Sequence, residues 1–170
     1  MIDRAASAPP VGPLFLVSQV GAQAMRLFAA RLAKVGLKPQ HAGILRILAH
    51  DEGLSQRALS TTLGAFASQV VLLLDDLEAQ KLLERRATPE DRRSHRLFLT
   101  TSGRKRATAI AEWTKEIERS FFGALSRSEL AKLESMLRDL VAAQALTPSV
   151  HPAYRNLERR RPPKKKGISR

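Results

Sequence analysis

The sequence has no cysteine, few aromatic residues and no long apolar run. None of its 170 residues is cysteine and 5% are aromatic, which excludes a disulfide scaffold and thiol-based redox sensing. No apolar stretch approaches the roughly 18 residues needed to cross a bilayer, and only a short one, from Leu14 to Val20, lies near the N-terminus. We therefore expect a cytoplasmic protein with no membrane partner.

Positive charge, by contrast, is abundant and unevenly distributed. The formal net charge is +13, so a polyanion is the first partner to consider. Residues 81–106 hold nine cations against three acids, and residues 155–170 hold eight against one. A basic membrane-surface helix is disfavoured because the first block contains Pro89 and turn residues. The pattern indicates a defined polyanion-binding surface and a basic tail.

Apolar residues at helical spacing predict two helices in the first third of the chain. Residues 13–35 carry apolar side chains at intervals of three and four, and Gly36 ends the pattern. Pro39 suits the first turn of a second helix, which stops at the polar turn 51–53. Because 44% of the residues are apolar, one packed core is expected.

A helix-turn-helix and a hairpin are predicted next. Ser55 is a natural N-cap for a short helix that Gly64 can end in a left-handed conformation, and another helix spans residues 67–80. The buried side of that second helix is expected to hold Val70, Leu73, Leu74 and Leu77. Residues 82–86 and 95–99 read as two strands. The expected fold class is mainly α: a winged helix-turn-helix with a two-stranded β-wing and a helical dimerisation platform.

Two more helices are predicted to complete the platform. Thr100 or Thr101 caps the first, and Ser126 or Ser128 starts the second. The first is expected to direct Ile110, Trp113, Ile117 and Phe121 toward a core, and the second carries Leu130, Leu133, Leu137 and Leu140 at helical spacing. The expected organisation is a flexible arm (1–12), a dimerisation region (13–36 and 104–146), a DNA-binding lobe (37–103) and a basic disordered tail (147–170).

Three segments of the chain carry a resemblance to a known family. They are residues 53–64, residues 75–85 and, most specifically, residues 89–104. In the last, an aspartate-any-arginine pattern falls on Asp91 and Arg93, and a leucine-threonine-any-any-glycine pattern falls on Leu99 to Gly103. Residues 14–145 resemble the multiple antibiotic resistance regulator (MarR) family. The resemblance implies a dimeric, helical DNA-binding regulator with a small wing, and an effector pocket between the dimer platform and the DNA-binding lobe.

The winged helix then assigns roles to candidate DNA-binding residues. Wing arginines favour the minor groove, and Asp91 can pair with Arg93 to shape the wing. Other arginines can neutralise phosphates, while Val71 and Leu72 can meet thymine methyl groups. Ser55 is equally explained as a helix cap, and the helix at 67–80 carries neither Lys nor Arg. The candidates are Ser55, Ser68, Gln69, Val71, Leu72, Arg85, Arg86, Arg92, Arg93 and Arg96.

The effector pocket that the resemblance implies has less support from the residues themselves. Its candidate lining residues are Gln23, His41, Arg46, His50 and Trp113, although ordinary packing explains each equally well. The four histidines lack a close metal-binding spacing, so neither a metal site nor a cofactor is expected. No nucleophile elbow, phosphate loop or glycine fingerprint appears, so an enzyme is not expected either.

The leading hypothesis is a bacterial, nucleoid-associated transcription regulator that binds a pseudo-palindromic operator as a homodimer. On this hypothesis it is a repressor that a small, aromatic ligand releases from DNA. The alternative is an architectural protein that coats DNA with weak sequence specificity, which a recognition helix without cations favours. A protein-interaction module is a third reading, opposed by the concentrated cations of residues 81–106.

Overall fold

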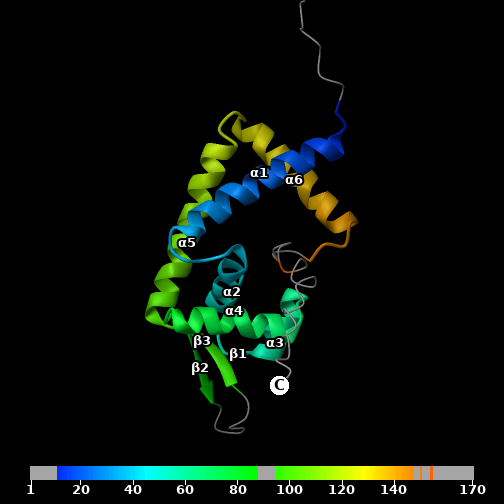
Figure 1. Cartoon of the computed structure of the whole chain (residues 1–170). Coiled ribbons are helices and arrows are strands. Elements are labelled where there is room, and N and C mark those ends of the chain that lie inside the picture. Colours follow the sequence, from blue (N-terminus) through cyan, green and yellow to red (C-terminus); the bar gives the residue numbers. More distant parts are fainter. Residues whose placement is uncertain (1–10, 88–94, 148–149, 151–153, 155–170) are drawn as a thin grey trace, which may run out of the picture.

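The chain folds into six helices and three short strands over the part that the structure describes. The computed structural model describes residues 11–87, 95–147, 150 and 154. The helices are α1 (Pro13–Ala33), α2 (Pro39–His50), α3 (Gln56–Leu63), α4 (Ala67–Ala79), α5 (Thr101–Phe121) and α6 (Arg127–Ala143). The strands are β1 (Leu54–Ser55), β2 (Leu83–Ala87) and β3 (His95–Leu99). The predicted mainly helical winged fold is confirmed (Figure 1).

The sheet has one strand more than predicted. Strands β2 and β3 pair antiparallel from Leu83 opposite Leu99 to Ala87 opposite His95, and they are the predicted wing strands. Strand β1 adds to the free side of β3, which gives the order β1-β3-β2. The expectation of two strands was therefore incomplete. A strand of two residues that ends on a helix N-cap is too short to show an alternating pattern.

Most predicted helix ends are confirmed by their capping contacts. The Ser55 hydroxyl accepts a hydrogen bond from the backbone N–H of Ala58 at 3.1 Å and so caps α3. Gly64 ends that helix at a φ of +58°, a conformation that suits glycine because it has no Cβ. Thr100 rather than Thr101 caps α5, and Ser126 rather than Ser128 caps α6. These side chains satisfy backbone donors that helix starts leave unpaired.

The core lies in the lobe formed by α2, α3, α4 and the sheet. The four apolar residues predicted for the buried side of α4 are all buried there, and Ile110 of α5 reaches it. Trp113 packs against the core, whereas Ile117 and Phe121 are only partly buried. No single helix in the described ranges is long and apolar enough to span a membrane, and α3 and α4 pass that test only together, as a pair bent by 112°.

Helices α1 and α6 lie at the end of the molecule opposite the sheet, and α5 runs between the two ends (Figure 1). Helix α6 buries none of its residues, and the first half of α1 is exposed. Their apolar stripes are thus uncovered in the single chain.

The expected disordered tail must be corrected at two residues. Val150 packs against the core and Tyr154 is buried within it. The prediction that residues 147–170 are all unstructured rested on their polar composition and on the absence of a repeating apolar pattern. Neither property reveals a single apolar side chain that packs into the core. The other residues after 147 and the arm at 1–10 lie outside the described residues.

The first turn of α5 packs directly on the backbone of residues 81 and 82. The Thr100 hydroxyl donates to the carbonyl oxygen of Lys81 at 2.7 Å and accepts from the N–H of Gly103 at 2.9 Å. A Cβ on Gly103 would overlap the carbonyl oxygen of Leu82 and lie 2.9 Å from its carbonyl carbon. The leucine-threonine-any-any-glycine motif therefore fixes how α5 leaves the sheet.

We predict that Gly103→Ala destabilises the protein by about 1–3 kcal/mol, because the new methyl group overlaps backbone that cannot rotate away. Urea unfolding followed by circular dichroism measures the change. Ser102→Ala, which alters an exposed position in the same helical turn, is the control and should change the free energy of unfolding by less than about 0.5 kcal/mol. Equal stability of the two variants would contradict the packing argument.

Candidate nucleic-acid interface and ligand pocket

The first half of α4 carries no charged residue. Ser68 and Leu72 are exposed, whereas Gln69 and Val71 are half-buried. Phe66, the N-cap residue of α4, is also exposed and was not among the predicted DNA-binding residues. An aromatic residue at a position that usually holds a polar cap is the signal that could have identified it. This surface can offer methyl and ring contacts together with the Ser68 hydroxyl.

The acidic residues of α4 are each paired with a cation from outside this helix. Arg85 of β2 contacts both Asp75 and Glu78, and Asp76 accepts from the Lys38 ammonium at 3.1 Å. Helix α4 has no cation of its own, so its carboxylates would otherwise repel a phosphate backbone. Arg85, predicted to contact DNA, is thus placed so that it offsets the negative charge of α4 and ties this helix to the wing.

Two of the predicted arginines lie together on the outer side of the wing. Arg86 and Arg96 are directly opposite each other in the β2–β3 ladder. Arg86 contacts Glu84 and lies 4.5 Å from the centre of the Phe98 ring, while Arg96 donates to the carbonyl oxygen of Gly53 at 3.1 Å. Like charges facing each other across strands are destabilising on their own. A polyanion would relieve that repulsion.

The structure does not add the remaining predicted DNA-binding residues to the group that Arg86 and Arg96 form. The Ser55 hydroxyl is occupied as the cap of α3. Asp91, Arg92 and Arg93, the most specific part of the wing motif, lie outside the described residues. Their roles in groove binding and wing shape stay predictions.

His41, predicted as a pocket residue, lies instead between α2 and α4. Its Nδ1 accepts a hydrogen bond from the backbone N–H of Lys38 at 3.2 Å, and its Nε2 lies 3.4 Å from a carboxylate oxygen of Asp76. Only 1% of the residue is exposed. Burial, together with the nearby Lys38 charge, lowers the pKa of His41 despite the opposing effect of Asp76. The neutral ring therefore lies between α2 and Asp76 of α4.

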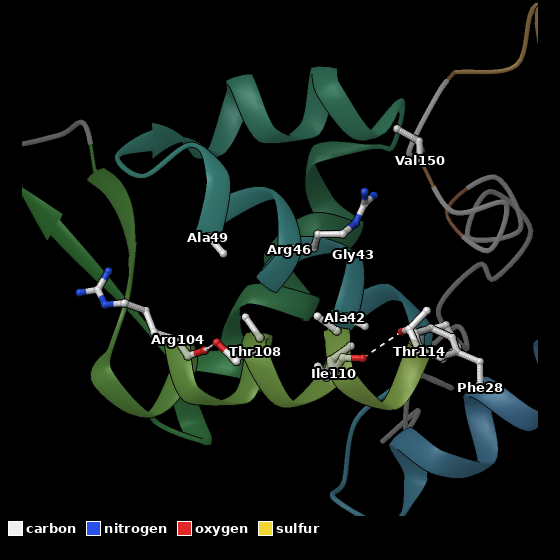
Figure 2. Close-up of a pocket in the computed structure, with 13 residues that line it drawn as sticks. Phe28, Ala42, Gly43, Arg46, Ala49, Arg104, Thr108, Ile110, Thr114 and Val150 are labelled. Carbon is white, nitrogen blue, oxygen red and sulfur yellow. Dashed lines mark hydrogen bonds between the residues drawn. The ribbon is translucent and has the colours of Figure 1, made fainter. Parts of the chain in front are cut away.

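A pocket of about 940 Å³ lies between α2 and α5, with Phe28 of α1 and Val150 at its edge. Its walls are mainly small and apolar, as Ala42, Gly43, Ala49, Ala107, Ala111 and Ile110 show. Two arginines complete it, Arg46 from α2 and Arg104 from α5, and Figure 2 shows their side chains extending in different directions at separate parts of the rim. Arg104 also pairs with Glu52. The site combines an apolar interior with cationic edges.

Of the five predicted pocket residues, Arg46 alone lines this pocket in the described part of the chain. Trp113 instead has the Arg31 guanidinium 4.9 Å from its ring centre, and Gln23 accepts hydrogen bonds from Arg26. His50 is exposed at the end of α2. Sequence reasoning missed Arg104, Thr108 and Thr114 as lining residues, which share one side of α5 and could have been grouped by helical spacing.

Comparison with known proteins agrees with this geometry. A family model described as the MarR family matches residues 35–94. A protein of Thauera aromatica, named for transcriptional regulation of the hcr operon, is 30% identical over 127 residues, which are 74% of this chain and 76% of the relative. The chain belongs to the MarR family.

Solved MarR-type structures share the fold. The DNA complex of Staphylococcus aureus MepR aligns with a TM-score of 0.66 and 23% identity over 79% of this chain and 99% of that one. Bordetella bronchiseptica BpsR, whose DNA binding is regulated by 6-hydroxynicotinic acid, aligns with a TM-score of 0.62 and 22% identity over 74% and 96%. Because its family and its named relatives are transcription regulators, this chain is a DNA-binding transcription regulator rather than an enzyme.

We predict that this MarR-family protein loses stability as the pH falls below about 6.5, the ordinary pKa of histidine. The folded-state pKa of His41 is lowered, so the unfolded chain takes up the proton first. The His41 contribution is therefore complete above pH 6.5 and is lost as the pH falls toward the folded-state pKa. Melting temperatures from pH 8 to pH 5 measure the loss. His41→Asn, which cannot titrate, should flatten the profile, whereas His50→Asn should not. A profile unchanged by His41→Asn would contradict this origin.

Proposed function

We propose that this protein is a homodimeric, sequence-specific repressor that a small apolar, anionic ligand releases from a pseudo-palindromic operator. The observation that carries the proposal is the pocket between α2 and α5, because it joins the DNA-binding lobe to a helix that extends away from it. A ligand bound there contacts both parts at once. The ligand can therefore favour one position of the DNA-binding lobe relative to α5 over another.

The pocket chemistry suggests the class of ligand. Alanine and glycine walls leave space for a flat, apolar body, and Arg46 or Arg104 can pair with a carboxylate. The volume of about 940 Å³ accommodates an aromatic acid and leaves room for the longer chain of its thioester. The related fold of BpsR, which responds to 6-hydroxynicotinic acid, is consistent with an aromatic acid.

The uncovered faces of α1 and α6 support the homodimer. Near its N-terminus α1 exposes five large apolar residues, Leu14, Phe15, Leu16, Val17 and Val20. Along α6, Leu130, Met136, Leu137 and Leu140 are exposed as well. Apolar patches of this kind are uncommon on monomers and mark interaction surfaces. A second copy, related by a twofold axis, would bury both stripes and place two winged lobes on one side.

The architectural alternative keeps one observation in its favour. Helix α4 contains no Lys or Arg, and its exposed side carries Leu72 and Phe66 rather than side chains that form bidentate hydrogen bonds with bases. Apolar contacts between these side chains and thymine methyl groups still distinguish one base sequence from another. The ratio of specific to nonspecific affinity separates the two functions.

We predict that selection from random duplexes yields a pseudo-palindrome with half-sites about 10 base pairs apart. At physiological salt the dimer should bind this sequence at least about 1,000-fold more tightly than unrelated duplex, as measured by competition. A ratio near one would instead establish DNA coating.

The same complex tests release by a ligand. Aromatic acids and their thioesters are added, and Arg46→Met keeps the apolar stem while removing the charge. This variant should retain operator affinity but need about tenfold more ligand for release, the usual effect of losing one charged hydrogen-bonding partner. If no compound releases either protein, the ligand-responsive part of the proposal is wrong.

We predict that Leu137→Asp separates the dimer. Two unpaired carboxylates would be buried at symmetry-related positions, which should raise the dimer dissociation constant by at least about 100-fold. Light scattering across a dilution series measures this. Ser135→Asp places the same side chain on the opposite side of α6 and should leave the dimer intact. A wild-type protein that is monomeric at micromolar concentration would contradict the proposal.

A further inference from the structure

The last described residue of the chain is a buried tyrosine. Tyr154 is the only tyrosine in the sequence, and 1% of it is exposed. It belongs to the same core as the leucines of the DNA-binding lobe, and Val150 packs against that core as well. The chain after α6 thus returns to the lobe and contacts it through an aromatic side chain.

Tyr154 docks on the backbone of α2. Its hydroxyl donates a hydrogen bond to the carbonyl oxygen of Gln40. A Cβ on Gly43 would overlap the phenol oxygen and lie 3.1 Å and 3.2 Å from two ring carbons, and its three nearest neighbours would all be Tyr154 atoms. Glycine is less favourable than alanine inside a helix. Helix α2 therefore has its glycine at the position where the tyrosine ring needs room.

The docking site adjoins the pocket. Gly43 and Val150 both line the pocket, and Arg46 lies one turn beyond Gly43. Burial raises the pKa of Tyr154 well above its ordinary range, while Arg46 acts in the opposite direction. The phenol consequently remains protonated at neutral pH and keeps its donor for Gln40.

We propose that Tyr154 is an internal competitor for the effector pocket, because its docking on Gly43 occupies space next to the pocket and holds Val150 in the pocket wall. The pocket volume of about 940 Å³ is the space that remains while the ring is docked. A ligand long enough to extend from it along α2 also needs the place of the ring, so such a ligand binds the form in which Tyr154 has left Gly43. The apparent affinity is then reduced by the small fraction of molecules in that form. This inference rests on the pocket being the effector site proposed above.

Two substitutions release the tyrosine from opposite sides of the contact. Tyr154→Ala removes the ring, whereas Gly43→Ala keeps the ring and fills the place where it sits. Gly43→Ala should not weaken α2, since alanine favours helix. Ser102→Ala is the control for a substitution to alanine, because Ser102 is exposed and lies outside the pocket lining. Deletion of residues 155–170 is a second control that retains Tyr154.

Two measurements on the full-length dimer follow the contact and its consequence. Isotope-labelled tyrosine gives a single set of NMR signals, which reports whether Tyr154 is docked. Fluorescence titration with bis-anilinonaphthalene sulfonate, an apolar dianion whose two linked aromatic halves are long enough to extend from the pocket along α2, gives a dissociation constant. We expect the signals of Gly43→Ala to move to the position of free tyrosine. Both Gly43→Ala and Tyr154→Ala should bind the probe about fivefold or more tightly than wild type, and both controls should behave as wild type.

The failures are distinguishable. The competition is overturned if the tyrosine signals of Gly43→Ala do not change, or if both variants bind the probe no more tightly than wild type. In that case aromatic acids can still release the protein from operator DNA, and the proposed function stands. Absence of probe binding from every protein, together with an operator complex that no aromatic acid releases, overturns the ligand-responsive function and this inference with it.

Discussion

The close approach of α5 to the backbone of Leu82 is the constraint on which the arrangement of the molecule depends. A helix start can come this near to another segment only where a side chain is missing, and Gly103 supplies that position. Thr100 caps the same helix and also holds the carbonyl of Lys81. The direction of α5 is thereby set by the turn between α4 and β2. Both the pocket against α2 and the distance from the lobe to α6 follow from that direction.

The negative charge of α4 is offset by cations that lie outside this helix. A recognition helix without cations is poorly suited to a polyanion if its carboxylates are free. Here Arg85 and Lys38 face those carboxylates from β2 and from the residue before α2. Each exposed ion pair contributes little to stability. Their larger effect is to offset the negative charge of α4 next to the wing, where Arg86 and Arg96 lie opposite each other.

Much of the fold could be predicted because it is encoded locally. Apolar spacing located the helices, and the caps at Ser55 and Gly64 were correct because each depends on residues within one helical turn. The site was harder. Helical spacing shows which residues share a side of α2, but not that α5 lies over Arg46 while α4 lies over His41. Tyr154 was missed for a related reason, since a single apolar residue has no period.

The Tyr154 contact also bears on how the two functional surfaces communicate. Eight cations lie in residues 155–170, directly after the docked ring. A partner that binds this segment with different affinity in the docked and released forms acts on the same equilibrium of Tyr154 that a pocket ligand does. Coupling between two binding events through one shared equilibrium is reciprocal. If the segment binds DNA more tightly while Tyr154 is docked, ligand and DNA must oppose each other by the same factor in both directions. Loss of the Tyr154 contact would then act together with the change in lobe position through which a pocket ligand opposes DNA binding.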